Sequence, residues 1–428
     1  MNPDISQSYL FLIILAAVYF FVSFFAIKVG LALTVLSMLF SPEIPIMPLG
    51  FRYLVIRVED ILIPVLFMAW MARISVQKEF RMFASSPLNK PIVLLLGLMI
   101  VSTAHGIFAR WVLPLTAVLY VFKTAEFFVI FFLVMNYART EREVKQFLFF
   151  ALITLTLVGI YTLFQVPHVQ IFSEHRISAP FEGSPEPASV GGYMAFLLLI
   201  LFGLFIYAES VLLKWVYGVV AIIVGIPFLY TLNRTSYAAL IAGLLFISVI
   251  AKKKWVITVL ILASLTSFIW LPEAVKDRLA FTRYDAKNPG RIFGVDQSSQ
   301  ERLTAFTRVW QQGFWVKSPL IGRGVTYYYS DNQYARTLSE IGIIGLVLWI
   351  WIFVRLFKIS IWLFHILRDG FFKGMVLGYR AGLIGILVHA FGAPTFYIVR
   401  IMEPFWFVTG LVVALYVLKV KEDLQVGS

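Results

Sequence analysis

Long runs of apolar residues alternate with short polar connections along almost the whole chain. A run of about twenty apolar residues is long enough to cross the hydrocarbon core of a bilayer as an α-helix. The runs are continuous and do not alternate apolar with polar positions, so they predict helices rather than a β-barrel. They lie near residues 8–27, 29–46, 54–72, 91–108, 112–138, 146–165, 188–208, 212–231, 235–251, 255–271, 337–358, 374–393 and 400–419. The pattern predicts an all-α polytopic membrane protein with twelve or thirteen spans.

The beginning of the chain leaves one alternative open. Only Lys28 separates the first two apolar runs, so they predict either two spans or one span with a re-entrant piece. The N-terminal sequence lacks a basic region and a small-residue cleavage site, which predicts a retained first span whose direction stays open. Further along, Glu59 and Asp60 predict the external start of a helix.

Lysine and arginine residues in the short connections predict which side faces the cytoplasm. Four connections carry many of them, and all four fall on one side of the predicted membrane. They are Arg73, Lys78, Arg81 and Lys90; Arg139, Arg142 and Lys145; Lys252 to Lys254; and Arg355, Lys358, Arg368 and Lys373. Lys419 and Lys421 place the C-terminus on the same, cytoplasmic side. Much of the net charge of +13 is thus explained by topology and anionic lipid, without a nucleic-acid partner.

The polar connections divide the chain into five parts. These are N-terminal membrane helices (1–165), a first external loop (166–187), central membrane helices (188–271), a large external loop with amphipathic helices (272–336) and C-terminal membrane helices (337–428). The large loop has an excess of basic residues on the external side, which the positive-inside rule tolerates but does not explain. A basic surface there suits an anionic, membrane-borne ligand such as a lipid phosphate or diphosphate.

Composition narrows the chemistry further. Sixty per cent of the residues are hydrophobic and 14% are charged, which excludes a soluble enzyme. The chain has no cysteine, so disulfides and thiolate metal sites are excluded. Its five histidines show no HxxxH or HExxH spacing, and no P-loop or GxGxxG motif follows a strand. We therefore expect no zinc, and no cofactor is expected.

Asp331 stands directly before a predicted span, in the sequence SDNQYARTLSEIGIIGL. One interpretation is a helix N-cap, because short polar side chains accept the free backbone N–H groups there. The other is a general base poised by a neighbouring cation or hydrogen bond. The residues that follow have structural interpretations: Arg336 and Glu340 predict a surface ion pair, and Gly342 with Gly345 predicts close approach of a neighbouring helix.

Arginines beside the predicted membrane are candidates for binding an anion. Arg234, in YTLNRTSYAAL, lies where one span ends outside and the next begins. It is either an interfacial arginine or a ligand-binding one, since a guanidinium binds two phosphate oxygens at once. Arg302 and Arg308 lie in SSQERLTAFTRVW, a predicted amphipathic helix at the bilayer interface. Its apolar residues are Leu303, Phe306 and Trp310.

The order of these elements resembles the O-antigen ligase and polymerase family, polytopic glycosyltransferases that act on lipid-linked saccharides outside the bacterial inner membrane. In that family a His or Asp followed by Asn, nine residues and GxxG leads into a span. DNQYARTLSEIGIIGL has Asp331, Asn332, Gly342 and Gly345 in these places. A family phrase like PLLGxG is matched by SPLIGRGVTYYY, which begins at Ser318.

Three further motifs occur in the family's order. An Arg in a short helix after a Ser-rich lead is matched by Arg302, and an Arg that opens a span in an SRxxxL-like context is matched by Arg234. The family's FxGxPN region resembles FEGSPEPASVGGY in the first external loop. The resemblance covers most of the chain, from RVEDILI to the helix after Gly345. Ligases of the family have His where this chain has Asp331, which favours a polymerase or another branch.

The resemblance implies a large-glycosyltransferase (GT-C-like) architecture in the inner membrane, with the active site on the periplasmic face. It implies an inverting, metal-independent transfer of a saccharide from a polyprenyl diphosphate to an acceptor hydroxyl. Asp331 is then the expected base. The arginines expected at the diphosphate are Arg234, Arg302, Arg308 and Arg176. Further substrate contacts are expected from Asn332, Tyr334 and Glu182.

Several functions fit this resemblance. The first is polymerisation of O-antigen or exopolysaccharide repeat units, and the alternatives are ligation to a lipid A core and O-glycosylation of a protein. A flippase for the same lipid-linked glycan belongs to another class, but the spans show no internal repeat and the basic residues lie outside the midplane. Expected partners are the polyprenyl-diphosphate-linked saccharide, the bilayer and other polysaccharide assembly proteins. The sequence leaves the sugar, the linkage and the acceptor open.

The predicted topology is testable because the chain has no cysteine of its own. A cysteine introduced at Ser298 is expected outside, and one at Lys253 inside. An impermeant thiol reagent added to intact spheroplasts should therefore label the first and spare the second. Equal labelling of both would contradict the orientation.

Overall fold

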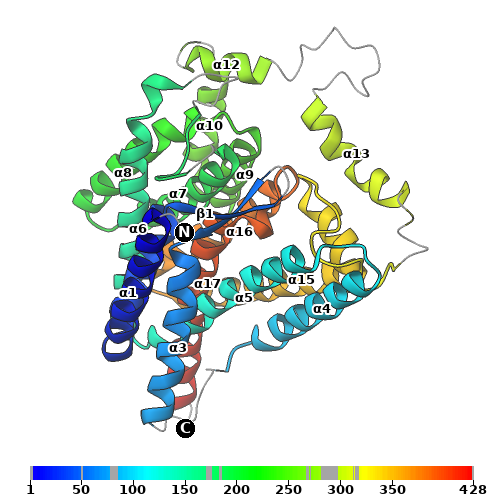
Figure 1. Cartoon of the computed structure of the whole chain (residues 1–428). Coiled ribbons are helices and arrows are strands. Elements are labelled where there is room, and N and C mark those ends of the chain that lie inside the picture. Colours follow the sequence, from blue (N-terminus) through cyan, green and yellow to red (C-terminus); the bar gives the residue numbers. More distant parts are fainter. Residues whose placement is uncertain are drawn as a thin grey trace.

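The structure is a computed structural model. It describes residues 3–49, 52–77, 85–169, 176–182, 186–266, 269, 271–280, 297–311, 313 and 318–426. Helices make up most of these residues (Figure 1). Within the described ranges, eight helices are long and apolar enough to cross a membrane. This confirms the predicted all-α polytopic membrane protein.

Each predicted apolar run contains a helix. In the first half these are α1 (Pro3–Phe25), α2 (Ile27–Phe40), α3 (Glu59–Gln77), α4 (Asn89–Phe108), α5 (Pro114–Tyr137) and α6 (Glu141–Leu163), followed by the short 3₁₀ helix η1 (Val166–His168). The central helices are α7 (Pro187–Tyr207), α8 (Val211–Tyr230), α9 (Arg234–Ile250) and α10 (Lys254–Leu265). The segment between α10 and α15, predicted to be external, contains α12 (Glu273–Ala280) and α13 (Gln297–Gln311). The last elements are α15 (Gln333–Ile366), α16 (Gly370–His389), the 3₁₀ helix η3 (Thr395–Tyr397) and α17 (Val399–Val426).

Not every predicted run forms a helix of full spanning length. Helix α10 has 12 residues and α2 has 14. At 1.5 Å per residue these helices reach about 18 and 21 Å, less than the roughly 30 Å of a hydrocarbon core. Eight spans are therefore supported by length and composition, and the count of twelve or thirteen stays a prediction.

A β-hairpin lies where the predicted spans 29–46 and 54–72 approach each other. Strand β1 (Glu43–Leu49) pairs antiparallel with β2 (Arg52–Arg57). Pro42 disfavours a helical conformation at the preceding Ser41, which is extended (φ −86°, ψ 125°), so α2 ends at Phe40. At the open end of the hairpin, Arg57 Nη2 forms an ion pair with Glu43 Oε1 at 2.7 Å. Helix α3 then begins at Glu59, as predicted, and not at residue 54.

Helices α7, α16 and α17 form the interior of the membrane-embedded part. In their most apolar stretches 83%, 72% and 83% of the residues are buried, against 17% in α8. In Figure 1 these three helices lie in the middle of the bundle, with α1, α3, α6 and α8 beside them. Helices α7 and α16 approach closely through small residues: a Cβ built on Gly203 would lie 2.3 Å from the carbonyl oxygen of Gly374. Such contacts are typical of packing between membrane helices.

Helix α15 is broken at Gly342, which has φ 69° and ψ −169°. A Cβ at this position would lie 2.2 Å from the carbonyl oxygen of Leu320, so the close neighbour is the loop 318–324. The predicted approach of another helix at this glycine is therefore wrong. Residues of the SPLIGRG phrase precede the helix in the sequence and pack against it at the break.

The loop 318–324 satisfies the backbone groups that the break leaves without helical partners. The N–H groups of Ile343 and Ile344 donate to the carbonyls of Pro319 and Leu320 at 2.9 and 3.1 Å. In return, the carbonyls of Ser339 and Glu340 accept from the N–H groups of Arg323 and Gly324 at 3.1 and 3.0 Å. Unpaired backbone groups are costly at membrane depth, so the broken helix and the loop require each other.

Substitution of Gly342 tests this arrangement. We expect Gly342→Ala to lower the thermal stability in detergent, because alanine fits neither the positive φ nor the contact with Leu320. Gly218→Ala is the matched control: Gly218 lies in α8 with no atom within 4 Å of its built Cβ, so the change should be neutral or stabilising. Similar melting temperatures for the two variants would contradict the proposed fit.

Candidate functional site

The candidate site lies where α13, the start of α15, the start of α9 and the end of α16 meet. Arg302 on α13 forms an ion pair with Asp331, with Nη2 and Oδ2 3.3 Å apart. A Cβ built on Gly392, just after α16, would lie 3.6 Å from Cδ of Arg302 and 2.0 Å from Cγ2 of Thr235. Thr235 follows Arg234, so the structure brings Asp331 and Arg302 into contact and places the α9 segment with Arg234 beside them.

Asn332, and not Asp331, is the N-cap of α15. Its Oδ1 accepts hydrogen bonds from the N–H groups of Tyr334 and Ala335, both at 3.1 Å. Its Nδ2 donates to the carbonyl of Arg302 at 3.4 Å, so the cap also contacts α13. The N-cap interpretation of Asp331 is therefore wrong. Its side chain is 42% exposed, so its carboxylate is accessible to a ligand.

One face of helix α13 packs against the start of α15, and this packing holds Arg302 in place. Ala305 and Val309 are buried and pack with Ala335. The neighbouring apolar residues of α13 are exposed: Leu303 (63%), Phe306 (42%) and Trp310 (59%). Arg308 is exposed and six residues from Arg302, on another side of the helix, so it does not accompany Arg302 to Asp331.

Arg234 is the first residue of α9. Asn233 caps this helix, accepting a hydrogen bond from the N–H of Ser236 at 2.9 Å. The preceding Leu232 has φ 53°, a conformation that costs energy for a residue with a side chain. A helix N-terminus carries a partial positive charge, and the half-buried Arg234 adds a full one. Together they form a place suited to an anion.

His389 at the end of α16 was not singled out by the sequence. It is 1% exposed, with Nε2 3.2 Å from Oγ of Ser236 and Nδ1 2.9 Å from Oγ1 of Thr395. Arg302 is close enough to interact with it electrostatically. The available signal was a single histidine inside a predicted span, which by itself does not distinguish a site from the protein interior.

Two other predicted contacts have structural partners of their own. The Tyr334 hydroxyl donates to the carbonyl of Leu387 at 2.7 Å, which ties α15 to α16. Glu182 forms a buried ion pair with Arg400 of α17, with Oε1 and Nη1 2.5 Å apart. Burial raises the pKa of Glu182 to about 7, and the Arg400 guanidinium acts in the opposite direction. Arg176 is half-buried and begins the same described segment, 176–182.

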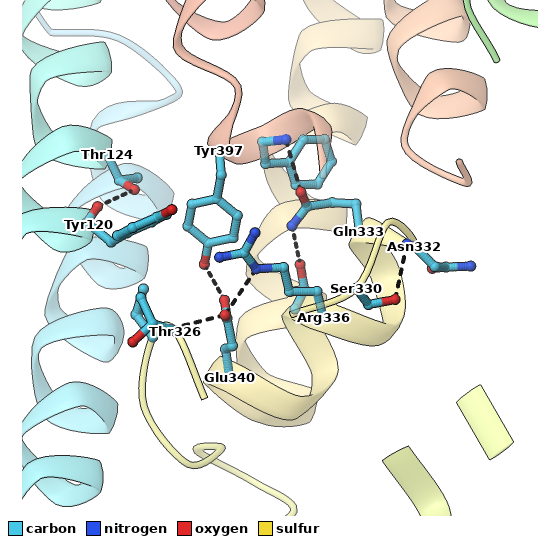
Figure 2. A network of polar contacts seen from close by, with 12 residues as sticks. Tyr120, Thr124, Thr326, Ser330, Asn332, Gln333, Arg336, Glu340 and Tyr397 are labelled. Carbon is cyan, nitrogen blue, oxygen red and sulfur yellow. Dashed lines mark hydrogen bonds and ion pairs between the residues drawn. The ribbon is translucent and has the colours of Figure 1, made fainter. Parts of the chain in front are cut away.

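Arg336 and Glu340 form a buried ion pair, not the predicted surface pair. Their side chains are 3% and 0% exposed, and Nε donates to Oε1 at 2.9 Å. Figure 2 shows the Tyr397 hydroxyl donating to the other carboxylate oxygen, at 2.7 Å. Burial and the neighbouring Glu340 raise the pKa of Tyr397 well above its usual range, so the hydroxyl keeps the proton that it donates. The prediction failed because distant segments cover this turn of the helix.

The arrangement offers a base beside a place for an anion. The Asp331 side chain is partly exposed, and Arg302 supplies a cation next to its carboxylate. The N-terminus of α9 adds positive charge with Arg234. In the part of the chain that the structure describes, no group of three or more histidine and acidic residues is placed to hold a metal ion. Much of the basic external loop, including 281–296, lies outside that part.

Because Asn332 and not Asp331 caps α15, we expect substitutions at these two residues to have different effects on stability. Asn332→Ala should lower the unfolding free energy by about 1 kcal/mol through loss of the cap. Asp331→Ala should have a much smaller effect, because its side chain forms only a partly exposed ion pair. Thermal unfolding of the purified variants in one detergent measures both. A larger loss for Asp331→Ala than for Asn332→Ala would show that the cap is misassigned.

Comparison with known proteins gives no assignment for this chain. No protein-family model matches it, and no curated protein matches it.

Proposed function

We propose that this protein is a membrane glycosyltransferase that moves a saccharide from a polyprenyl diphosphate to an acceptor hydroxyl. The observation that carries the proposal is the Asp331 carboxylate: it is not used as a helix cap, it is partly exposed, and it lies 3.3 Å from the Arg302 guanidinium. This is the pairing of a base with an anion-binding group that such a transfer requires. The proposed location is the inner membrane, with the site on the periplasmic face and the C-terminus in the cytoplasm.

In the proposed reaction the acceptor oxygen attacks the anomeric carbon of the donor sugar while Asp331 takes the proton of the acceptor hydroxyl. The bond between this carbon and the diphosphate oxygen breaks, and the polyprenyl diphosphate leaves with the electron pair. Direct displacement inverts the configuration at the carbon. Arg302 and Arg234 stabilise the negative charge that grows on the leaving group. A guanidinium binds two phosphate oxygens at once, which suits this role.

We propose polymerisation of O-antigen or exopolysaccharide repeat units as the specific activity. The support is Asp331, since the resembling ligases have His in that place. Ligation to a lipid core and O-glycosylation of a protein use the same donor and differ in the acceptor. A flippase would also bind the donor but would have no use for a base beside the diphosphate.

Reconstitution with a defined substrate distinguishes these activities. The purified protein is placed in liposomes with a polyprenyl-diphosphate-linked repeat unit, and the products are analysed by mass spectrometry. A polymerase gives glycans of two or more repeats on one lipid. Adding a lipid core or an acceptor protein reveals the two alternatives. Movement of the intact substrate across the bilayer, with no new glycosidic bond, would refute the proposal.

Substitutions at the site should then reduce turnover without loss of the folded protein. Asp331→Asn keeps the size of the side chain and removes the base, so we expect a loss of roughly a hundredfold or more. Arg302→Lys and Arg234→Lys keep the charge and lose the bidentate geometry, and should also lower turnover strongly. The matched control is Arg355→Lys, an exposed arginine on the predicted cytoplasmic side. Wild-type turnover in the Asp331→Asn variant would place the base elsewhere.

A further inference from the structure

The carboxylate of Glu340 joins three segments of the chain. Its Oε1 accepts from Arg336 Nε within α15 and from the backbone N–H of Thr326, both at 2.9 Å. Its Oε2 accepts from the hydroxyl of Tyr397 in η3 at 2.7 Å. In Figure 2 the three donors surround this one carboxylate, from the helix, the preceding loop and η3. It is completely buried, so these bonds are sheltered from water.

Thr326 shows that the loop before Asp331 is held in a costly shape. Its φ is 73°, a region that β-branched residues rarely adopt and that costs energy. The bond from its N–H to Glu340 is one of the contacts that hold this conformation. Only four residues separate Thr326 from Asp331, so a change in the backbone here is passed along the loop to the proposed base.

The main chain of Glu340 holds the same loop. Because α15 is broken at Gly342, the carbonyl of Glu340 accepts from the N–H of Gly324 at 3.0 Å. It also accepts from the hydroxyl of Ser102 on α4 at 2.6 Å, and Ser102 in turn accepts from the N–H of Gly324 at 3.1 Å. Side chain and main chain of this one residue thus fix residues 324 to 326.

On its other side, Glu340 is connected to the arginine part of the site. Tyr397 and Thr395 belong to the same short helix η3. The Thr395 hydroxyl lies 2.9 Å from His389, which lies 3.2 Å from Ser236, two residues after Arg234. Through the backbone of η3, these contacts connect Glu340 to the N-terminus of α9.

Aromatic rings fix the remaining part of the network. The Arg336 guanidinium lies 4.1 Å from the ring centroid of Tyr397, and the rings of Tyr120 and Tyr329 are 5.6 and 5.7 Å away. A guanidinium that faces aromatic rings is held in place without a second carboxylate. The ion pair with Glu340 is therefore rigid, and so is the position of Tyr397 relative to α15.

We propose that Glu340 is a positioning residue that sets the separation of Asp331 from Arg234 and Arg302. It does so through Thr326 on the side of the base and through Tyr397 on the side of the arginines. The inference rests on the proposed function, because it assigns the network a role in the same transfer. It adds Tyr397, which lies outside the family-like motifs, and gives a role to Thr326 and Glu340, which lie within them at positions where the resemblance implies none.

The first test is a double-mutant cycle. Tyr397→Phe removes one hydroxyl and keeps the ring over Arg336. We expect it to lower kcat by roughly ten- to a hundredfold, as a small misplacement of a reacting group does, with little change in KM for the donor. In the Asp331→Asn background the same change should have an effect of less than about twofold, because the base that it positions is absent.

The matched control removes a comparable hydroxyl elsewhere. Tyr379 in α16 has a buried hydroxyl 2.9 Å from Oγ1 of Thr409 in α17. Tyr379→Phe should leave kcat unchanged in both backgrounds. Glu340→Gln is a second variant of the network, in case Tyr397→Phe folds poorly: the amide oxygen still accepts from Thr326, whereas the charge beside Arg336 is lost. Losses that multiply fully in the Asp331→Asn background would overturn the proposal.

A second measurement does not depend on activity. Tyr329 is 67% exposed, and a cysteine in its place is the only one in the chain, so it carries a single spin label. Its ring is the most distant of the three from the Arg336 guanidinium, and every protein compared carries the same replacement. Tyr397→Phe should increase the mobility of this label, and Tyr379→Phe should not. Unchanged mobility would show that the network does not hold the loop. If the wild type forms no glycan, the proposed transfer fails, and the label still decides whether Tyr397 restrains the loop.

Discussion

The break of α15 at Gly342 is the constraint on which the site depends. Inside a bilayer a helix pairs its own backbone groups, and a break leaves some of them without partners. Here the loop 318–324 supplies those partners, so it is bound to the helix over both sides of the break. The same chain segment continues into Thr326 and Asp331. A requirement of backbone hydrogen bonding therefore brings this loop against the break in α15 and fixes where its polar residues lie.

The site is assembled from segments that are far apart in the sequence. Arg234 comes from the start of α9, Arg302 from α13, Asp331 from the residue before a cap, and His389 from the end of α16. The interior helices α7 and α16 pack in close backbone contact at Gly203 and Gly374, and so support the helix ends that carry these residues. The separation of tasks is clear: the helices provide rigidity, and the residues at their ends provide charge and hydrogen-bonding groups.

The helical architecture was predictable from the sequence because it depends on local information. An apolar run of twenty residues forms a helix in a bilayer whatever its neighbours are. The N-terminus of α3 at Glu59 was predicted from the acidic residues Glu59 and Asp60, whereas the apolar run placed the span from residue 54. The hairpin before it was missed, since several of its residues were assigned to the predicted spans 29–46 and 54–72 and the pairing of Glu43 with Arg57 is formed across a turn.

Site features that depend on distant segments could not be predicted in the same way. Arg336 and Glu340 have the spacing of an ordinary surface pair, and only η3, some sixty residues later, shows that they are buried. His389 can be recognised as part of the site only from its contacts with Ser236 and Thr395, which lie far from it or beyond its helix. The arginines and Asp331 were found because short motifs place charge at predicted membrane edges. Their mutual distances, and the pairing of Glu182 with Arg400, come from the fold alone.

The adjacent residues Asp331 and Asn332 divide two tasks that a single residue often combines. Asn332 caps the helix, and the partly exposed Asp331 takes no part in starting it. The reactive group at position 331 can therefore be exchanged for another, such as the imidazole of the resembling ligases, without a compensating change in the helix behind it. The chemistry at position 331 can therefore change in evolution while the fold of α15 stays the same.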